Sequence, residues 1–174
     1  QGLGLRYLSH PELRPATKYP PGFPVLLAGW IKLFGDSVIS MKIAVCLTFV
    51  GAVGVTWLIA SRFLNLWLAT IVSLVISTSS IFVSYSHQIL SDMPYTFFSL
   101  VAIYLVVTSD SSLPRLWIGL GLSIWAFLIR TVGGTLVLAF VIYLFLSKRR
   151  RASLVLLTML VGVGLCWSLR NRLE

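Results

Sequence analysis

The chain has 174 residues, of which 57% are hydrophobic and only 11% are charged. Soluble domains carry about 25% charged residues, so this composition excludes an ordinary soluble protein and predicts an all-α integral membrane protein. The net charge of +9 would suggest a nucleic-acid partner in a soluble protein. Here the basic residues fall mostly in short connections between apolar runs, which is typical of loops beside a membrane, and we expect no nucleic acid.

Residues 1–37 are predicted to form a loop with an interfacial helix. Residues 18–24, with the sequence KYPPGFP, contain three prolines, and because proline fixes φ this cationic segment is stiff. The apolar stretch 25–34 would rise about 15 Å as a helix, half of a membrane's hydrocarbon core, so we expect it to lie at the surface. Trp30 and Lys32 suit that depth, because tryptophan prefers the interface and a lysine reaches toward water.

Residues 38–174 predict a bundle of about six transmembrane helices. The predicted spans are residues 38–60, 66–85, 93–108, 116–129, 132–147 and 154–169. A single helix over residues 116–147 would be about 48 Å long, so we expect a hairpin at Arg130, with Gly133 and Gly134 providing a flexible turn. An arginine recessed at this hairpin tip needs an anionic partner. Close helix contacts are expected at Gly51, Gly54, Gly119, Gly121, Gly162 and Gly164.

The basic cluster at residues 148–151, with the sequence KRRR, predicts the cytoplasmic side of the bundle. Counting spans back from this cluster places segment 1–37, the connection 87–92 and Arg130 together on the outer side. We therefore expect the proline-rich loop and these polar residues to converge on one outer face.

Arg130 stands alone between two apolar runs, and a guanidinium group suits bidentate contact with phosphate. The alternative is that it anchors ordinary lipid head groups. Asp92 precedes Met93 and Pro94, so it either caps the next helix or belongs to a site. His87 could carry a proton or bind an acceptor, or do neither, and its spacing from Asp92 implies no contact.

The order of these motifs resembles a known family. The sequence YPPGFP at residues 19–24, followed by an apolar turn and KLFGDS at residues 32–37, resembles the first outer loop of GT-C glycosyltransferases. The nearest group is the protein O-mannosyltransferase and aminoarabinose-transferase-like family. Residues 86–94 (SHQILSDMP) are similar to its next outer loop, and residues 129–133 (IRTVG) to its following hairpin. Residues 167–171 (WSLRN) resemble the end of a later span.

The resemblance implies a GT-C-like bundle that transfers a sugar from a polyprenyl-phosphate donor to a glycan, lipid or protein acceptor. The reaction would take place on the outer face of a plasma membrane such as the bacterial inner membrane. Lys18 and Arg130 would bind the donor phosphate, and Tyr19, His87 and Asp92 would line the site. Lys18 could instead be a solvated loop residue, and Tyr19 could pack against the prolines.

The resemblance also implies a catalytic acid ahead of the Tyr-Pro-Pro motif. Glu12 does not match its context, so we expect the acid upstream of Gln1, in a longer chain of which this sequence is a piece cut at both ends. The lipid-linked sugar is a substrate, and no cofactor or metal-ligand pattern is visible in the sequence. The alternatives are a transporter or flippase of lipid-linked sugars and a non-catalytic membrane scaffold subunit.

Overall fold

The protein is an all-α membrane protein, as the composition predicts. The structure is a computed structural model that describes residues 20–109 and 112–173. Within these residues all regular structure is helical. The helices are α1 (Gly22–Phe34), α2 (Val38–Ala60), α3 (Leu66–Ser77), α4 (Ser80–Ser86), α5 (Asp92–Val107), α6 (Leu113–Ile129), α7 (Gly133–Leu146) and α8 (Arg150–Leu173).

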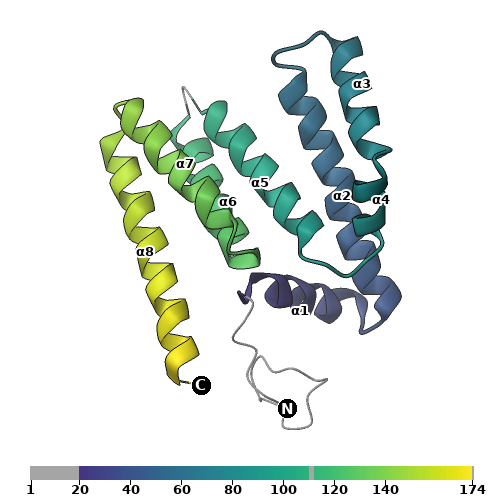
Figure 1. Cartoon of the computed structure of the whole chain (residues 1–174), viewed down its shortest axis with the longest axis horizontal. Coiled ribbons are helices and arrows are strands. Elements are labelled where there is room, and N and C mark those ends of the chain that lie inside the picture. Colours follow the sequence, from purple (N-terminus) through teal and green to yellow (C-terminus); the bar gives the residue numbers. More distant parts are fainter. Residues whose placement is uncertain (1–19, 110–111, 174) are drawn as a thin grey trace.

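If α3 and α4 are counted as one bent unit, the helices after α1 run in alternating directions between two ends of the bundle (Figure 1). At one end, here called the α1 end, α1 lies across the ends of other helices, near the connection from α4 to α5 and the turn from α6 to α7. At the other end, here called the basic end, α7 is joined to α8 through residues 147–149, which adjoin Arg150 and Arg151. The sequence-based grouping of Arg130 with the 87–92 connection, away from the basic cluster, is therefore confirmed.

Helix α1 begins three residues earlier than the predicted interfacial helix. Pro24 lies in its first turn, where backbone N–H groups have no partner inside the helix, so a proline is tolerated there. The helix ends where Gly35 adopts a left-handed φ of 87° and donates its N–H to the Ile31 carbonyl over 2.8 Å. The predicted helix is confirmed, with wider bounds and a transverse orientation (Figure 1).

Two polar contacts fix the junction between α1 and α2. Ser37 caps α2, because its side chain accepts a hydrogen bond from the Ser40 amide over 3.0 Å. The indole of Trp30 donates to the Ser40 hydroxyl over 2.9 Å, and its ring lies 4.2 Å from that of Phe34. The side chain that the sequence places at a membrane interface therefore also ties α1 to α2.

The predicted span at residues 66–85 is not one continuous helix. It is broken into α3 and α4, which are bent by 62°. The break falls in a run of hydroxyl residues, where Ser77 and Thr78 both donate to the Leu74 carbonyl over 2.9 Å. Such side-chain bonds compete with the helix ladder, which explains a break that hydropathy does not reveal.

The predicted hairpin between α6 and α7 is confirmed, but Gly133 acts differently from the prediction. It has an ordinary helical backbone at the start of α7 rather than a left-handed one. A Cβ added there would lie 2.6 Å from the backbone of Phe127 on α6. The glycine therefore permits close helix contact instead of supplying flexibility.

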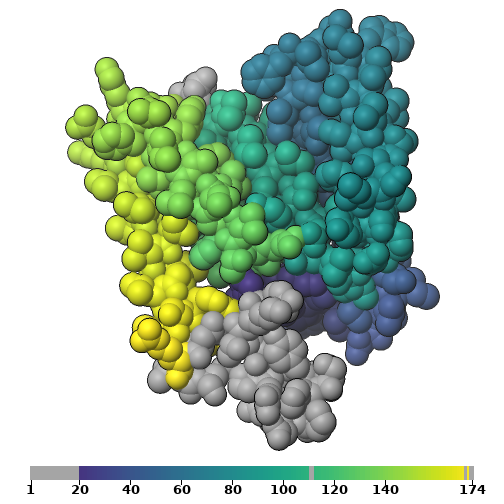
Figure 2. All heavy atoms as spheres, in the orientation of Figure 1, coloured from purple at the N-terminus to yellow at the C-terminus, as the bar shows by residue number. Residues whose placement is uncertain are grey.

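A buried core cluster joins α5, α6, α7 and the start of α8. Its buried members are Ala102, Val106, Leu116, Leu120, Val137, Phe140, Leu144, Ala152 and Leu156. In Figure 2, α2 to α4 form one side of the molecule and α7 and α8 the other, with α5 and α6 between them. Large apolar side chains are exposed on the outer helices, for example Trp67 at 82% and Leu146 at 74%, as expected of surfaces that face lipid.

Two described helices, α2 and residues 150–170 of α8, are long and apolar enough to cross a membrane. The count becomes three if the bent pair α3 and α4 is one span. Helices α5, α6 and α7 are apolar but shorter. The alternating directions agree with six crossings of the bundle, while six complete membrane spans stay a prediction.

Candidate functional site

An open pocket of about 440 Å³ lies at the α1 end of the bundle. The start of α1, the last residue before α5 and the turn from α6 to α7 form its walls. The lining residues are Pro20, Phe23, Pro24, Ser91, Ile129, Arg130, Thr131 and Val132. Arg130 is the one charged side chain among these described residues, so the pocket combines an apolar wall with a single fixed cation.

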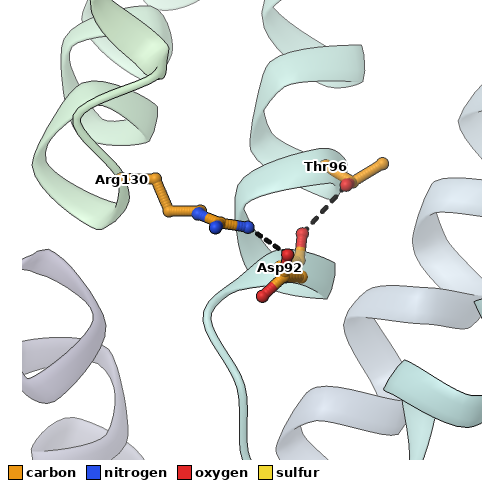
Figure 3. Close-up of polar contacts among 3 residues, drawn as sticks. All are labelled: Asp92, Thr96 and Arg130. Carbon is orange, nitrogen blue, oxygen red and sulfur yellow. Dashed lines mark hydrogen bonds and ion pairs between the residues drawn. The ribbon is translucent and has the colours of Figure 1, made fainter.

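Arg130 forms an ion pair with Asp92 across the edge of this pocket. Its Nη1 donates to Asp92 Oδ1, and the two residues are 38 positions apart in the sequence (Figure 3). The side chains are 39% and 29% exposed, so solvent screens the pair, and its main effect is to orient the guanidinium. The other N–H groups of Arg130 have no hydrogen-bond partner within the described residues, which leaves donors for an anion.

The backbone positions of Arg130 and Asp92 explain why their side chains form an ion pair. Arg130 ends α6 with an extended backbone, and its carbonyl accepts from the Gly133 amide over 2.8 Å, which closes the turn. Asp92 is the first residue of α5, where a negative charge interacts favourably with the helix dipole. Thr96 donates to the Asp92 carbonyl over 2.8 Å (Figure 3).

The alternative that Asp92 caps the next helix is wrong. Ser91 holds the N-cap position of α5, and no side-chain capping bond is formed there. The carboxylate of Asp92 is instead directed to Arg130. The anionic partner that the sequence required for Arg130 is therefore Asp92.

The start of α1 forms the other wall of the pocket through a close backbone contact. Gly22 is buried, and a Cβ added to it would lie 2.5 Å from the carbonyl oxygen of Leu128 on α6. Only glycine permits this approach without a shift of one helix. The prolines that line the pocket are thus held against the same hairpin that carries Arg130.

The family model of dolichyl-phosphate-mannose-protein mannosyltransferases matches residues 18–169. The chain belongs to this mannosyltransferase family. Comparisons with curated proteins and with solved structures give no significant match. The resemblance drawn from the sequence motifs is confirmed at the level of the family, and with it a mannosyltransferase-like glycosyltransferase.

The other predicted site residues of this mannosyltransferase-family chain are placed differently. Lys18 and Tyr19 lie outside the described residues. His87 is exposed at the end of α4, and its Nδ1 lies 2.9 Å from the Val83 carbonyl, so as a donor it bonds its own helix. The structure therefore brings together Asp92 and Arg130. Neither His87 nor Asp92 is among the residues that line the pocket, and Asp92 acts on it only through Arg130.

Sequence reasoning missed Phe23, Ser91 and Thr131 as pocket residues. The motifs that carry the family resemblance contain Phe23 and Ser91, and the turn position of Thr131 beside Arg130 was a usable signal. No group of three or more His, Cys, Asp or Glu residues that could hold a metal ion occurs within the part of the chain that the structure describes.

Proposed function

We propose that the pocket at the α1 end binds the phosphate of a polyprenyl-phosphate sugar and that the protein transfers this sugar to an acceptor. The observation that carries the proposal is the Arg130 guanidinium, which Asp92 holds at the wall of a pocket in a chain of the mannosyltransferase family. The family description names a mannose donor linked to a lipid phosphate, so mannose is the first sugar to test.

The chemistry requires charge stabilisation on the leaving group. In a single displacement, the acceptor hydroxyl loses its proton to a general base, and its oxygen forms a bond to the anomeric carbon as the bond from that carbon to the phosphate oxygen breaks. The electron pair remains on the phosphate, which gains negative charge. A preorganised guanidinium stabilises that charge more in the transition state than in the bound donor.

Asp92 acts in this proposal as a positioning residue. Its carboxylate is engaged by Arg130, so we do not assign it as the base that takes the acceptor proton. By fixing one edge of the guanidinium, it presents the remaining N–H groups to the phosphate. Lys18, in the proline-rich segment, is proposed to supply a second cation for the phosphate. Tyr19 and His87 are proposed to line the part of the site that holds the sugar.

The side of the membrane follows from charge. Residues 148–151 at the basic end favour the cytoplasm, so the α1 end would face outward. A lipid-linked donor would then approach the pocket from the outer leaflet. The acceptor would be a glycan, a lipid or a protein on that face.

A transporter of lipid-linked sugars would share a cationic pocket but would need paired broken helices in matched halves. Among the described helices, one bent pair, α3 with α4, is long and apolar enough together to form a broken span. The family match and the single pair together favour the glycosyltransferase over the transporter.

The test is transfer of radiolabelled mannose from polyprenyl-phosphate mannose to membrane acceptors by the full-length protein. We expect Arg130→Ala to lower the rate by about 100-fold, as loss of one charge-stabilising donor does in other enzymes. Arg115→Ala, an exposed arginine at the start of α6, is the matched control and should retain activity. Wild-type turnover by a folded Arg130→Ala protein would overturn the assignment.

A further inference from the structure

A second open pocket, of about 760 Å³, lies at the basic end of the bundle and is not explained by sugar transfer. It forms where the end of α5, the start of α6, the connection from α7 to α8 and the first turn of α8 meet. The lining residues are Ser109, Ser112, Leu113, Leu116, Trp117, Lys148, Arg149, Arg150, Arg151 and Ala152.

The charge of this pocket is strongly positive. Residues 148–151 supply four consecutive cations. The facing connection between Ser109 and Ser112 contains a single acid, Asp110, which lies outside the described residues. By sequence, the two connections therefore carry an excess of three positive charges, and such a cluster is stabilised when an anion lies among its members.

The backbone around Lys148 forms a tight turn that gathers these cations. Lys148 adopts a left-handed φ of 59°, the one such non-glycine residue among those described. The Lys148 amide donates to the Phe145 carbonyl over 3.1 Å, and the Arg149 amide donates to that of Leu144 over 2.9 Å. These two bonds end α7 in a Schellman motif, a place where glycine is usual, so the lysine is kept at a conformational cost.

Two of the four cations are held by neighbouring elements. Arg149 donates to the Ser109 hydroxyl on the α5 side over 3.2 Å. The guanidinium of Arg150 lies 5.6 Å from the ring centroid of Phe145. These contacts preorganise the cluster, while the side chains of Lys148 and Arg151 have no hydrogen-bond or ion-pair partner within the described part of the chain.

The opposite wall of the pocket combines an apolar side chain, Leu113, with an amphipathic one, Trp117. Trp117 is 44% exposed and Leu113 is 70% exposed, and both line the pocket beside the cations. Tryptophan is favoured at the level of lipid head groups. A ligand that matches both walls needs a phosphate group attached to hydrocarbon, which a small soluble anion does not provide.

We propose that this pocket binds the phosphate of an anionic phospholipid from the leaflet at the basic end. Basic pockets between membrane helices on the cytoplasmic side bind anionic head groups in this way. Lys148 and Arg151 contact the phosphate oxygens, and Trp117 and Leu113 contact the glycerol and the first part of the acyl chains. This site is independent of the proposed sugar transfer, because it lies at the other end of the bundle.

The test uses the purified full chain in a neutral detergent, with retained lipid measured by native mass spectrometry. Phosphatidylglycerol is compared with phosphatidylcholine of the same acyl chains. The pocket variant is Lys148→Asn with Arg151→Gln, because asparagine tolerates a left-handed backbone. The control variant, Lys32→Gln with Lys42→Gln, removes the same charge from exposed positions on α1 and α2.

We expect the pocket variant to retain at least about tenfold less phosphatidylglycerol than the wild type, and the control variant to match the wild type. Equal losses in both variants would show general charge attraction and overturn the site. The thermal midpoint of the wild type is also measured with inorganic phosphate and with phosphatidylglycerol. An equal rise with both would overturn the lipid as the ligand.

A second measurement leaves the basic residues unchanged in case the pocket variant does not fold. Phosphatidylglycerol brominated near the head group is added to the wild type and to Trp117→Phe. We expect quenching of tryptophan fluorescence in the wild type and a clearly smaller fractional change in the variant. Equal quenching of the two proteins would overturn the proposal.

Discussion

Gly22 on α1 contacts the main chain of Leu128 on α6 so closely that a single methyl group on its Cα would lie 2.5 Å from the Leu128 carbonyl oxygen. The obstacle is backbone near the end of a helix, which cannot rotate away as a side chain can. This contact sets the distance between the proline-rich wall of the pocket and the hairpin that carries Arg130.

Gly22→Ala should therefore lower both stability and sugar transfer. The methyl group forces α1 away from α6. We expect the free energy of unfolding to fall by about 1–3 kcal/mol, as in other overpacked sites. The measurement is the thermal midpoint in detergent together with the transfer rate. Gly29→Ala is the matched control, because a Cβ there meets no atom of the described residues within 4 Å and alanine favours a helix. A Gly22→Ala protein as stable as Gly29→Ala would contradict the docking contact.

The ion pair at the site should show coupling between its partners. Asp92→Asn removes the charge that orients Arg130, so we expect transfer to fall, but less than in Arg130→Ala. In the double variant the Asp92 substitution should add little, because its partner is already absent. The four transfer rates of the wild type, the two single variants and the double variant, each with the donor KM, provide the cycle. Additive losses in the double variant would mean that Asp92 acts independently of Arg130.

Lys18→Ala tests the second proposed phosphate cation. We expect transfer to fall by about 10-fold to 100-fold with the thermal midpoint unchanged, because the role proposed for Lys18 is to stabilise phosphate charge and not the fold. Lys32→Ala is the matched control, since Lys32 is exposed on α1. If both variants lose activity equally, the effect is one of general charge on this face.

Two buried serines should respond in opposite directions to the same substitution. The Ser99 hydroxyl is buried without a hydrogen-bond partner within the described residues, so Ser99→Ala should stabilise the protein by about 1 kcal/mol. The buried Ser153 hydroxyl donates to the Val141 carbonyl on α7 over 2.9 Å. Ser153→Ala should cost about 0.6 kcal/mol, the mean for hydrogen bonds between membrane helices. Thermal midpoints in one detergent would compare them, and a shift of the same sign in both would refute this assignment.

The helical class, the hairpin at Arg130 and the division into two ends could be predicted from the sequence, because they depend on hydropathy, length and one basic cluster. The break between α3 and α4 could not, since it depends on hydroxyl groups that bond to Leu74 inside an apolar run. Hydropathy records the polarity of such residues but not where their hydroxyl groups bond.

The sequence predicted that Arg130 has an anionic partner but not which residue it is. The chain has five acids, and span parity leaves Glu12, Asp36, Asp92 and Glu174 on the side of Arg130. Selecting Asp92 requires knowing that α5 begins beside the hairpin turn, which is tertiary information.

The close helix contacts expected at glycines were only partly correct, because which face of a helix meets a neighbour is also tertiary information. A Cβ added at Gly51 or Gly119 meets a neighbouring helix, whereas one added at Gly54, Gly121, Gly162 or Gly164 meets no described atom within 4 Å.

The short helices of the hairpin have a consequence for the surrounding lipid. Helix α6 has 17 residues and α7 has 14, so at 1.5 Å per residue they measure about 26 and 21 Å, against a hydrocarbon core of about 30 Å. A bilayer relieves such hydrophobic mismatch by thinning where it meets the short helices. The head-group plane would then dip toward the turn at Arg130, and a lipid-borne phosphate could reach the guanidinium without leaving its own leaflet.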